Sequence, residues 1–260
     1  MNWEAAGVGI ATLALFRPEL ARVYKAWFKP PVVDIIETED IEVGFTNFGP
    51  IVGLLGTLRA IHRDAFVARM SLKVTRREDS ATHAFDWGAF RSMQFTPSDD
   101  SLIRCSSFLL TEDYGAPYHV AFIDRDTQSK LRSIIEKLQK EWYDACSSEV
   151  GDTKSRDLQE VGQLFAEAQK KLRPEFTKSP FYVDSWGRIG RLFYWEAGLF
   201  DLELTVQTSR PDHKHAKRWT FGLTQEDADR LRLNQGMLVG AVVGEAVGSF
   251  NFVHTPYPMK

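Results

Sequence analysis

Residues 65–76 read AFVARMSLKVTR, and this stretch decides the predicted fold because its apolar side chains recur at every second position. Successive side chains of a strand point to opposite faces, so a period of two predicts a strand with one face in a core and one in water. A sheet with one solvated face is typically antiparallel. The side chains predicted to face the core are Phe66, Ala68, Met70, Leu72 and Val74.

The same alternation recurs along much of the chain outside one helical region. Further strands are predicted at residues 41–46, 102–110, 118–123, 200–207 and 219–223. Residues 126–174 instead carry two apolar stripes at helical spacing, joined by a short polar loop, which predicts an antiparallel helical hairpin. Further on, Thr224 and Asp227 have the spacing of a capping box and predict a short helix over residues 225–233 that ends near Asn234.

Strands, a helical hairpin and more strands predict a mainly β protein with α insertions. Two separate small sandwiches would each hold too few strands to close a core, so we expect a single domain over residues 31–260 with a helical insertion at about 126–174. The segment from Trp195 to Val206, where an aromatic residue and a glycine precede an alternating strand, resembles the late strand pair of immunoglobulin-like domains. This resemblance of pattern implies an immunoglobulin-like antiparallel β-sandwich and no functional residue. We expect an N-terminal helix over residues 1–30 to precede it.

Residues 1–30 combine an apolar run with aromatic and cationic flanks. The run from Ala5 to Phe16 is shorter than the roughly 20 residues that span a membrane, and its flanks differ from those of a secretory signal peptide. We expect an amphipathic helix that lies at a membrane interface or, equally, one that packs on the protein's own core or on a second copy. The residues expected to contact a membrane or partner are Trp3, Leu15, Phe16, Leu20, Val23, Trp27 and Phe28.

The overall charge disfavours a nucleic-acid partner. The chain has 32 Lys and Arg residues against 35 Asp and Glu residues, a near balance that creates no general positive field. Cys105 and Cys146 are isolated and lack the second pair that a zinc site or a disulfide framework would need. We therefore expect reduced thiols, a cytoplasmic location with membrane association through the N-terminus, and no cofactor.

A polar loop holds the weak candidates for a metal site. His213 and His215 are two residues apart, so both imidazoles can face the same side of a strand, and Asp212 is their neighbour. A zinc site usually has three or four ligands, and without a supporting cluster the pattern favours a solvated hairpin loop. Cations in the same loop also suit a phosphate or lipid headgroup, although the adjacent Trp219 is expected to face the core. The candidate anion patch consists of Arg210, Lys214, Lys217 and Arg218.

No signature of nucleotide binding or of nucleophilic or acid–base catalysis outweighs its structural interpretation, so no catalytic residue is predicted. The glycine-rich stretch 49–57, for example, lacks the lysine of a phosphate-binding loop. The leading hypothesis is a non-enzymatic, membrane-associated or complex-forming protein that presents protein-binding surfaces. The alternatives are an enzyme or small-ligand sensor whose site is not readable from the sequence, and a homo-oligomer assembled through the N-terminal helix.

Overall fold

The computed structural model describes residues 32–91, 102–112, 114–151, 157–209, 212–245 and 248–256. The predicted N-terminal helix over residues 1–30 therefore lies outside the described residues. The strands are β1 (Val32–Thr46), β2 (Gly49–Ile61), β3 (Ala65–Arg76), β4 (Thr82–Arg91), β5 (Leu102–Arg104), β6 (Phe108–Leu110), β7 (Ala116–Ile123), β8 (Gly198–Ser209), β9 (His213–Leu223) and β10 (Phe252–Pro256). The helices are α2 (Arg125–Val150), α3 (Leu158–Phe176), α4 (Pro180–Gly190) and α5 (Gln225–Val242).

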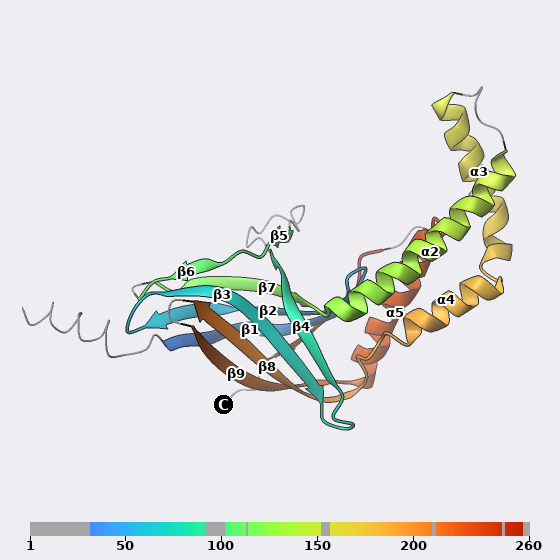
Figure 1. The fold of residues 1–260 in the computed structure, drawn as a ribbon. Helices are drawn as coiled ribbons and strands as arrows, with labels where there is room; N and C mark the ends of the chain where they lie inside the picture. Colours follow the sequence, from blue (N-terminus) through green and yellow to red (C-terminus); the bar gives the residue numbers. More distant parts are fainter. Residues whose placement is uncertain are drawn as a thin grey trace, which may run out of the picture.

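The described strands form one continuous sheet that curls around its own core (Figure 1). Their order is β10-β1-β2-β7-β4-β3-β8-β9, with β5 paired to β4 and β6 paired to β3, and neighbouring strands are antiparallel. The predicted mainly antiparallel β fold is thus confirmed. The immunoglobulin-like sandwich is not confirmed, because a sandwich has two sheets packed face to face whereas these strands share one hydrogen-bonded sheet.

Strand β3 shows why the predicted core face was only partly right. Met70, Leu72 and Val74 are buried as predicted, but Phe66 is 41% exposed whereas its neighbour Val67 is fully buried. The pairing of β3 with β8 shifts register between Val67 and Arg69. Because an extra residue in one strand reverses the alternation on one side of it, the irregularity turns Phe66 outward.

The interior of the curl is filled by aromatic and aliphatic side chains. Trp195 is fully buried, and its indole Nε1 donates a hydrogen bond of 2.9 Å to the backbone oxygen of Gly44. The Trp195 ring packs against Phe85 and Phe200, with ring centroids 6.1 and 5.7 Å apart. Helix α5 contacts β1 and helix α2 contacts β2, so the two helices pack against one end of this core. Figure 1 shows the helices at the end of the sheet opposite the start of β1.

The helical insertion is an arm that extends beyond the sheet (Figure 1). The predicted hairpin is present as α2 and α3, but the insertion also includes α4, and α3 continues past Pro174 to Phe176. Proline is tolerated there because it lies in the last turn, which Thr177 closes by donating its backbone N–H to the carbonyl of Arg173. The arm has a small second core, formed by Trp142, Cys146 and Ala168 together with Val243 at the end of α5.

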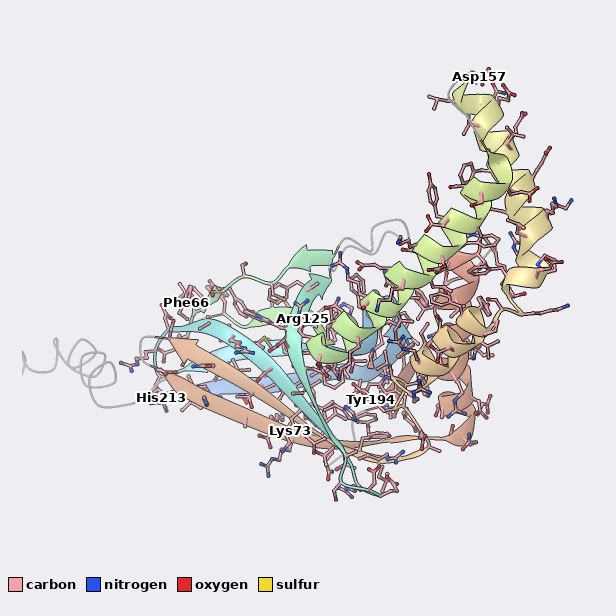
Figure 2. All side chains as sticks on the ribbon, turned by 45° about the vertical axis from the view of Figure 1, so that its right-hand side comes forward. Phe66, Lys73, Arg125, Asp157, Tyr194 and His213 are labelled. Atoms are coloured by element: carbon pink, nitrogen blue, oxygen red, sulfur yellow. The ribbon has the colours of Figure 1, made fainter. Side chains whose placement is uncertain are left out.

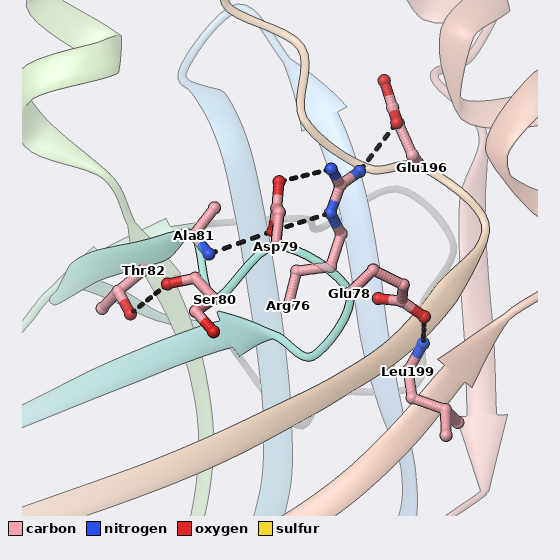
Figure 3. A network of polar contacts seen from close by, with 8 residues as sticks. All are labelled: Arg76, Glu78, Asp79, Ser80, Ala81, Thr82, Glu196 and Leu199. Atoms are coloured by element: carbon pink, nitrogen blue, oxygen red, sulfur yellow. Dashed lines mark hydrogen bonds and ion pairs between the residues drawn. The ribbon is translucent and has the colours of Figure 1, made fainter.

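The turn between β3 and β4 is fastened to the chain that leads from α4 into β8 (Figure 3). The Arg76 guanidinium bonds to the carboxylates of Asp79 and Glu196, and its hydrogen bonds hold the pKa of Asp79 at about 2. The Glu78 carboxylate accepts a 2.9 Å hydrogen bond from the backbone N–H of Leu199. A Cβ at Gly198 would lie 2.4 Å from that carboxylate, and its φ is +144°, so this position requires glycine.

Candidate binding groove and the predicted polar loop

An open groove of about 520 Å³ lies between α2 and α5. On α2, its lining residues fall on one helical face because they are three or four positions apart. The C-terminal part of α5 forms the facing wall, and the β1–β2 turn and the segment before β10 close one end. The lining residues are Gln128, Arg132, Ile135 and Gln139 of α2, Leu238, Ala241 and Val242 of α5, and Asn47, Phe48 and Phe250.

The floor of this groove is apolar and the rim is polar. Leu238 is 6% exposed, and Ile135 and Val242 pack against the main core, so the floor is anchored to the folded interior. The rim carries amide groups together with Arg132, whose guanidinium Nε lies 2.7 Å from the Glu136 carboxylate. An apolar floor with a few polar groups around it is the usual composition of a binding site.

A second apolar lobe of about 310 Å³ adjoins the groove across Phe48 and Phe250, which line both. It opens over the surface of the sheet, where Ile51 and Ile123 form a small buried cluster with Ala121. Phe48 packs against this cluster. The two aromatic rings therefore form a shared wall between an inter-helix groove and a sheet-surface lobe.

Local hydrogen bonds hold the two aromatic walls in place. Asn234 is fully buried in α5, and its side-chain nitrogen and oxygen bond to the backbone oxygen and nitrogen of Asn251, each at 2.8 Å. This pair fixes the chain next to Phe250. In the β1–β2 turn, the Thr46 hydroxyl accepts a 3.1 Å hydrogen bond from the backbone N–H of Phe48. The turn is completed by a glycine at position 49 with φ +79°, a value that glycine adopts without strain.

The residues predicted as metal ligands lie at the end of the sheet remote from the helices, where Figure 2 labels His213 and Phe66. His213 and His215 stand on the same side of β9, with ring centroids 6.4 Å apart. His215 Nδ1 accepts a 3.3 Å hydrogen bond from the backbone N–H of Val33, and Asp212 accepts one from Gln207. Burial, together with His213, lowers the pKa of His215, which suits an accepting imidazole. Among the described residues, no group of three or more His, Cys, Asp or Glu side chains is arranged to hold a metal ion.

The residues of the predicted anion patch are divided between two sides of β9. Lys217 points toward β1, where its ammonium contacts the Glu37 carboxylate and donates to the backbone oxygen of Ile35. Arg218 points the other way, with its Nε 2.6 Å from the Glu203 carboxylate. Lys214 is four residues from Arg218 on β9, so its side chain lies on that same outer side, where it is exposed. Arg210 lies outside the described residues.

Together, His215 and Lys217 join the two parts of the sheet that curling brings near each other. The edge strand β9 and the first half of β1 approach without a backbone ladder, and these two side chains bond to the backbone of β1 at Val33 and Ile35. The acidic partners come from two different strands, because Glu37 lies in β1, remote in sequence, and Glu203 lies opposite Arg218 in the neighbouring strand β8. That pairing explains why cations adjacent in the sequence do not form one free patch.

The remaining predicted contacts cannot be placed on the described structure. The membrane or partner contacts Trp3, Leu15, Phe16, Leu20, Val23, Trp27 and Phe28 all lie outside the described residues. In the part of the chain that the structure describes, no helix has the length and apolar character to cross a membrane. Cys105 and Cys146 are free thiols, and burial raises the pKa of Cys105 to about 11.

The groove itself was not predicted from the sequence, since its walls come from four separate segments of the chain. The regular spacing of Gln128, Arg132, Ile135 and Gln139 on one helical face was the signal that could have indicated its α2 wall.

No family model matches this chain, and no curated protein or solved structure shows significant similarity to it. A function must therefore be inferred from the geometry and chemistry of these residues.

Proposed function

We propose that this protein is a non-enzymatic, complex-forming protein that binds an amphipathic helix of a partner protein in the α2–α5 groove. The observation that carries the proposal is the anchored apolar floor of an open groove of about 520 Å³. The stretch from Gln128 to Gln139 covers about 16 Å of helix axis, or about three turns. A partner helix places apolar anchors on one face over a comparable length.

The chemistry of the rim favours binding over catalysis. Arg132 is the one titratable residue among the described residues that line the groove. Catalytic sites usually bring together several titratable groups with perturbed pKa values. The amides of Asn47, Gln128 and Gln139 can instead bond to polar groups along the edge of a bound helix. The groove thus has the apolar interior and polar rim that are typical of protein interfaces.

In this proposal the N-terminal segment tethers the protein to a membrane or to a second protein. Strand β1 begins at Val32, next to that segment, and ends at Thr46, next to the groove. Fifteen residues of strand extend over about 50 Å. A tether at one end and a groove at the other would hold a bound partner at a defined distance from the attachment point, in a cytoplasmic, membrane-associated setting.

Site-specific photocrosslinking in the cells of origin tests the proposal. A photoreactive amino acid at Gln139 on the rim should give a discrete crosslinked product with a different protein. The substitution Ala241→Trp fills the groove from an exposed position and should abolish this product, whereas Ala166→Trp at an exposed position of α3 should leave it unchanged. A product that persists in Ala241→Trp, a crosslinked homodimer, or no product would contradict the proposal.

A further inference from the structure

A second cleft, of about 410 Å³, lies on a different face of α2, where that helix packs against α4. It is separate from the apolar groove, since the two share no lining residue. Its α2 wall contains two hydroxyl groups and one ammonium group, and its α4 wall ends in two guanidinium groups. The lining residues are Ser129, Lys130, Ser133, Ile134, Arg188, Arg191 and Leu192.

The charge of this cleft is positive, because three cations and no carboxylate are among its lining residues. Lys130 has an ion pair of 2.5 Å with Asp126, and Arg188 has a longer one of 4.0 Å with Asp184. Both pairs are largely exposed, so they neutralise the cations weakly. Arg191 forms no ion pair with the residues that the structure describes.

Helix energetics account for part of this arrangement. Cations near the C-terminus of a helix are stabilised by its dipole, which explains the placement of Arg188 and Arg191 at the end of α4. The dipole of α4 does not explain why the facing wall also presents an ammonium group and the hydroxyl groups of Ser129 and Ser133. Donors that converge from two helices onto one cleft indicate a ligand with several acceptor oxygens.

We infer that the α2–α4 cleft binds the phosphate group of a small molecule. Guanidinium groups match phosphate oxygens with paired hydrogen bonds, an ammonium group adds a point charge, and hydroxyl groups donate to the remaining oxygens. Ile134 and Leu192 supply an apolar wall against which the organic part of a phosphate ester can pack. The volume of about 410 Å³ lies within the range of small-molecule sites.

Isothermal titration calorimetry of the full chain with phenyl phosphate and with inorganic phosphate, at constant ionic strength, tests this inference. We expect saturable binding of at least one probe. The exposed-site variant Arg191→Gln should weaken binding about tenfold, and Ser133→Asp, which puts a carboxylate in the cleft, should weaken it further. Lys137→Gln, on α2 but outside the cleft, should leave binding unchanged.

The two probes also distinguish the source of the phosphate. Tighter binding of phenyl phosphate indicates an ester whose organic part contacts the apolar wall, and equal binding indicates free phosphate; either result supports the site. The inference is overturned if neither probe saturates by about 10 mM, which corresponds to a negligible affinity. It is equally overturned if Arg191→Gln has no effect, or if Lys137→Gln reduces binding as much as Arg191→Gln does.

Discussion

Replacing Asn234 with alanine should destabilise the protein and release one wall of the binding groove. The side chain is fully buried and makes two 2.8 Å hydrogen bonds to the backbone of Asn251. Removing it leaves one N–H and one C=O group without those bonds, at a cost of about 1–3 kcal/mol for each group that stays dry. Asn251 is only half-buried, so water will restore part of the loss, and we expect the free energy of unfolding to fall by about 2–4 kcal/mol.

The assay is urea unfolding followed by tryptophan fluorescence, with hydrogen exchange at the Asn251 amide as a local readout. For a chain of this size the expected loss lowers the melting temperature by roughly 4–16 °C. Leu233→Ala is the matched control, because Leu233 precedes Asn234 on α5 and is 65% exposed. A loss below about 0.5 kcal/mol, the usual range of surface substitutions, would refute the proposed role of Asn234, as would an equal loss in the control.

Three further results are expected. Burial lowers the pKa values of His83 and His215 below 6.5, so the unfolded chain binds more protons than the folded chain near that pH. The free energy of unfolding should therefore fall as the pH drops through about 6.5. His215→Gln should flatten that slope in unfolding measured between about pH 5 and 7, and an unchanged slope would contradict this. Gly56→Ala places a Cβ 2.5 Å from a backbone oxygen of β1 and should lower the free energy of unfolding in urea by about 1–3 kcal/mol. Gly222→Ala, whose Cβ would have its nearest atom at 3.4 Å, should be tolerated, and equal losses in the two variants would show that this crowding is unimportant. Trp142→Ala removes the largest side chain of the arm's small core and should speed hydrogen exchange in α3 without changing β2, while a uniform increase would show that arm and sheet unfold together.

The local pattern of apolar and capping residues correctly predicted the strands and helix starts that depend only on residues close together in the sequence. The alternation in 200–207 is confirmed in β8, and the Thr224 capping box is present at the start of α5. The same helix does not end near Asn234 as predicted, because that side chain is buried by tertiary contacts and bonds to Asn251 instead of terminating the helix. Propensity alone does not report such a partner.

The features that depend on distant pairing could not be predicted. A register shift between Val67 and Arg69 reverses one end of β3, and nothing in the local alternation indicates it. The neutralising partner of Lys217 is Glu37, which is remote in sequence. Likewise, Phe48 and Phe250 both line the groove only because α5 and β10, which come late in the chain, pack beside β1.

The most direct test of the central claim is a titration of the protein with a neutral solvatochromic dye that fluoresces in apolar surroundings. An accessible apolar groove between α2 and α5 predicts saturable, one-to-one binding with a blue-shifted emission, a loss of that binding in Ala241→Trp, and wild-type binding in Ala166→Trp. Binding that is absent, or that is the same in Ala241→Trp as in the wild type, would contradict the claim that this groove is the binding site.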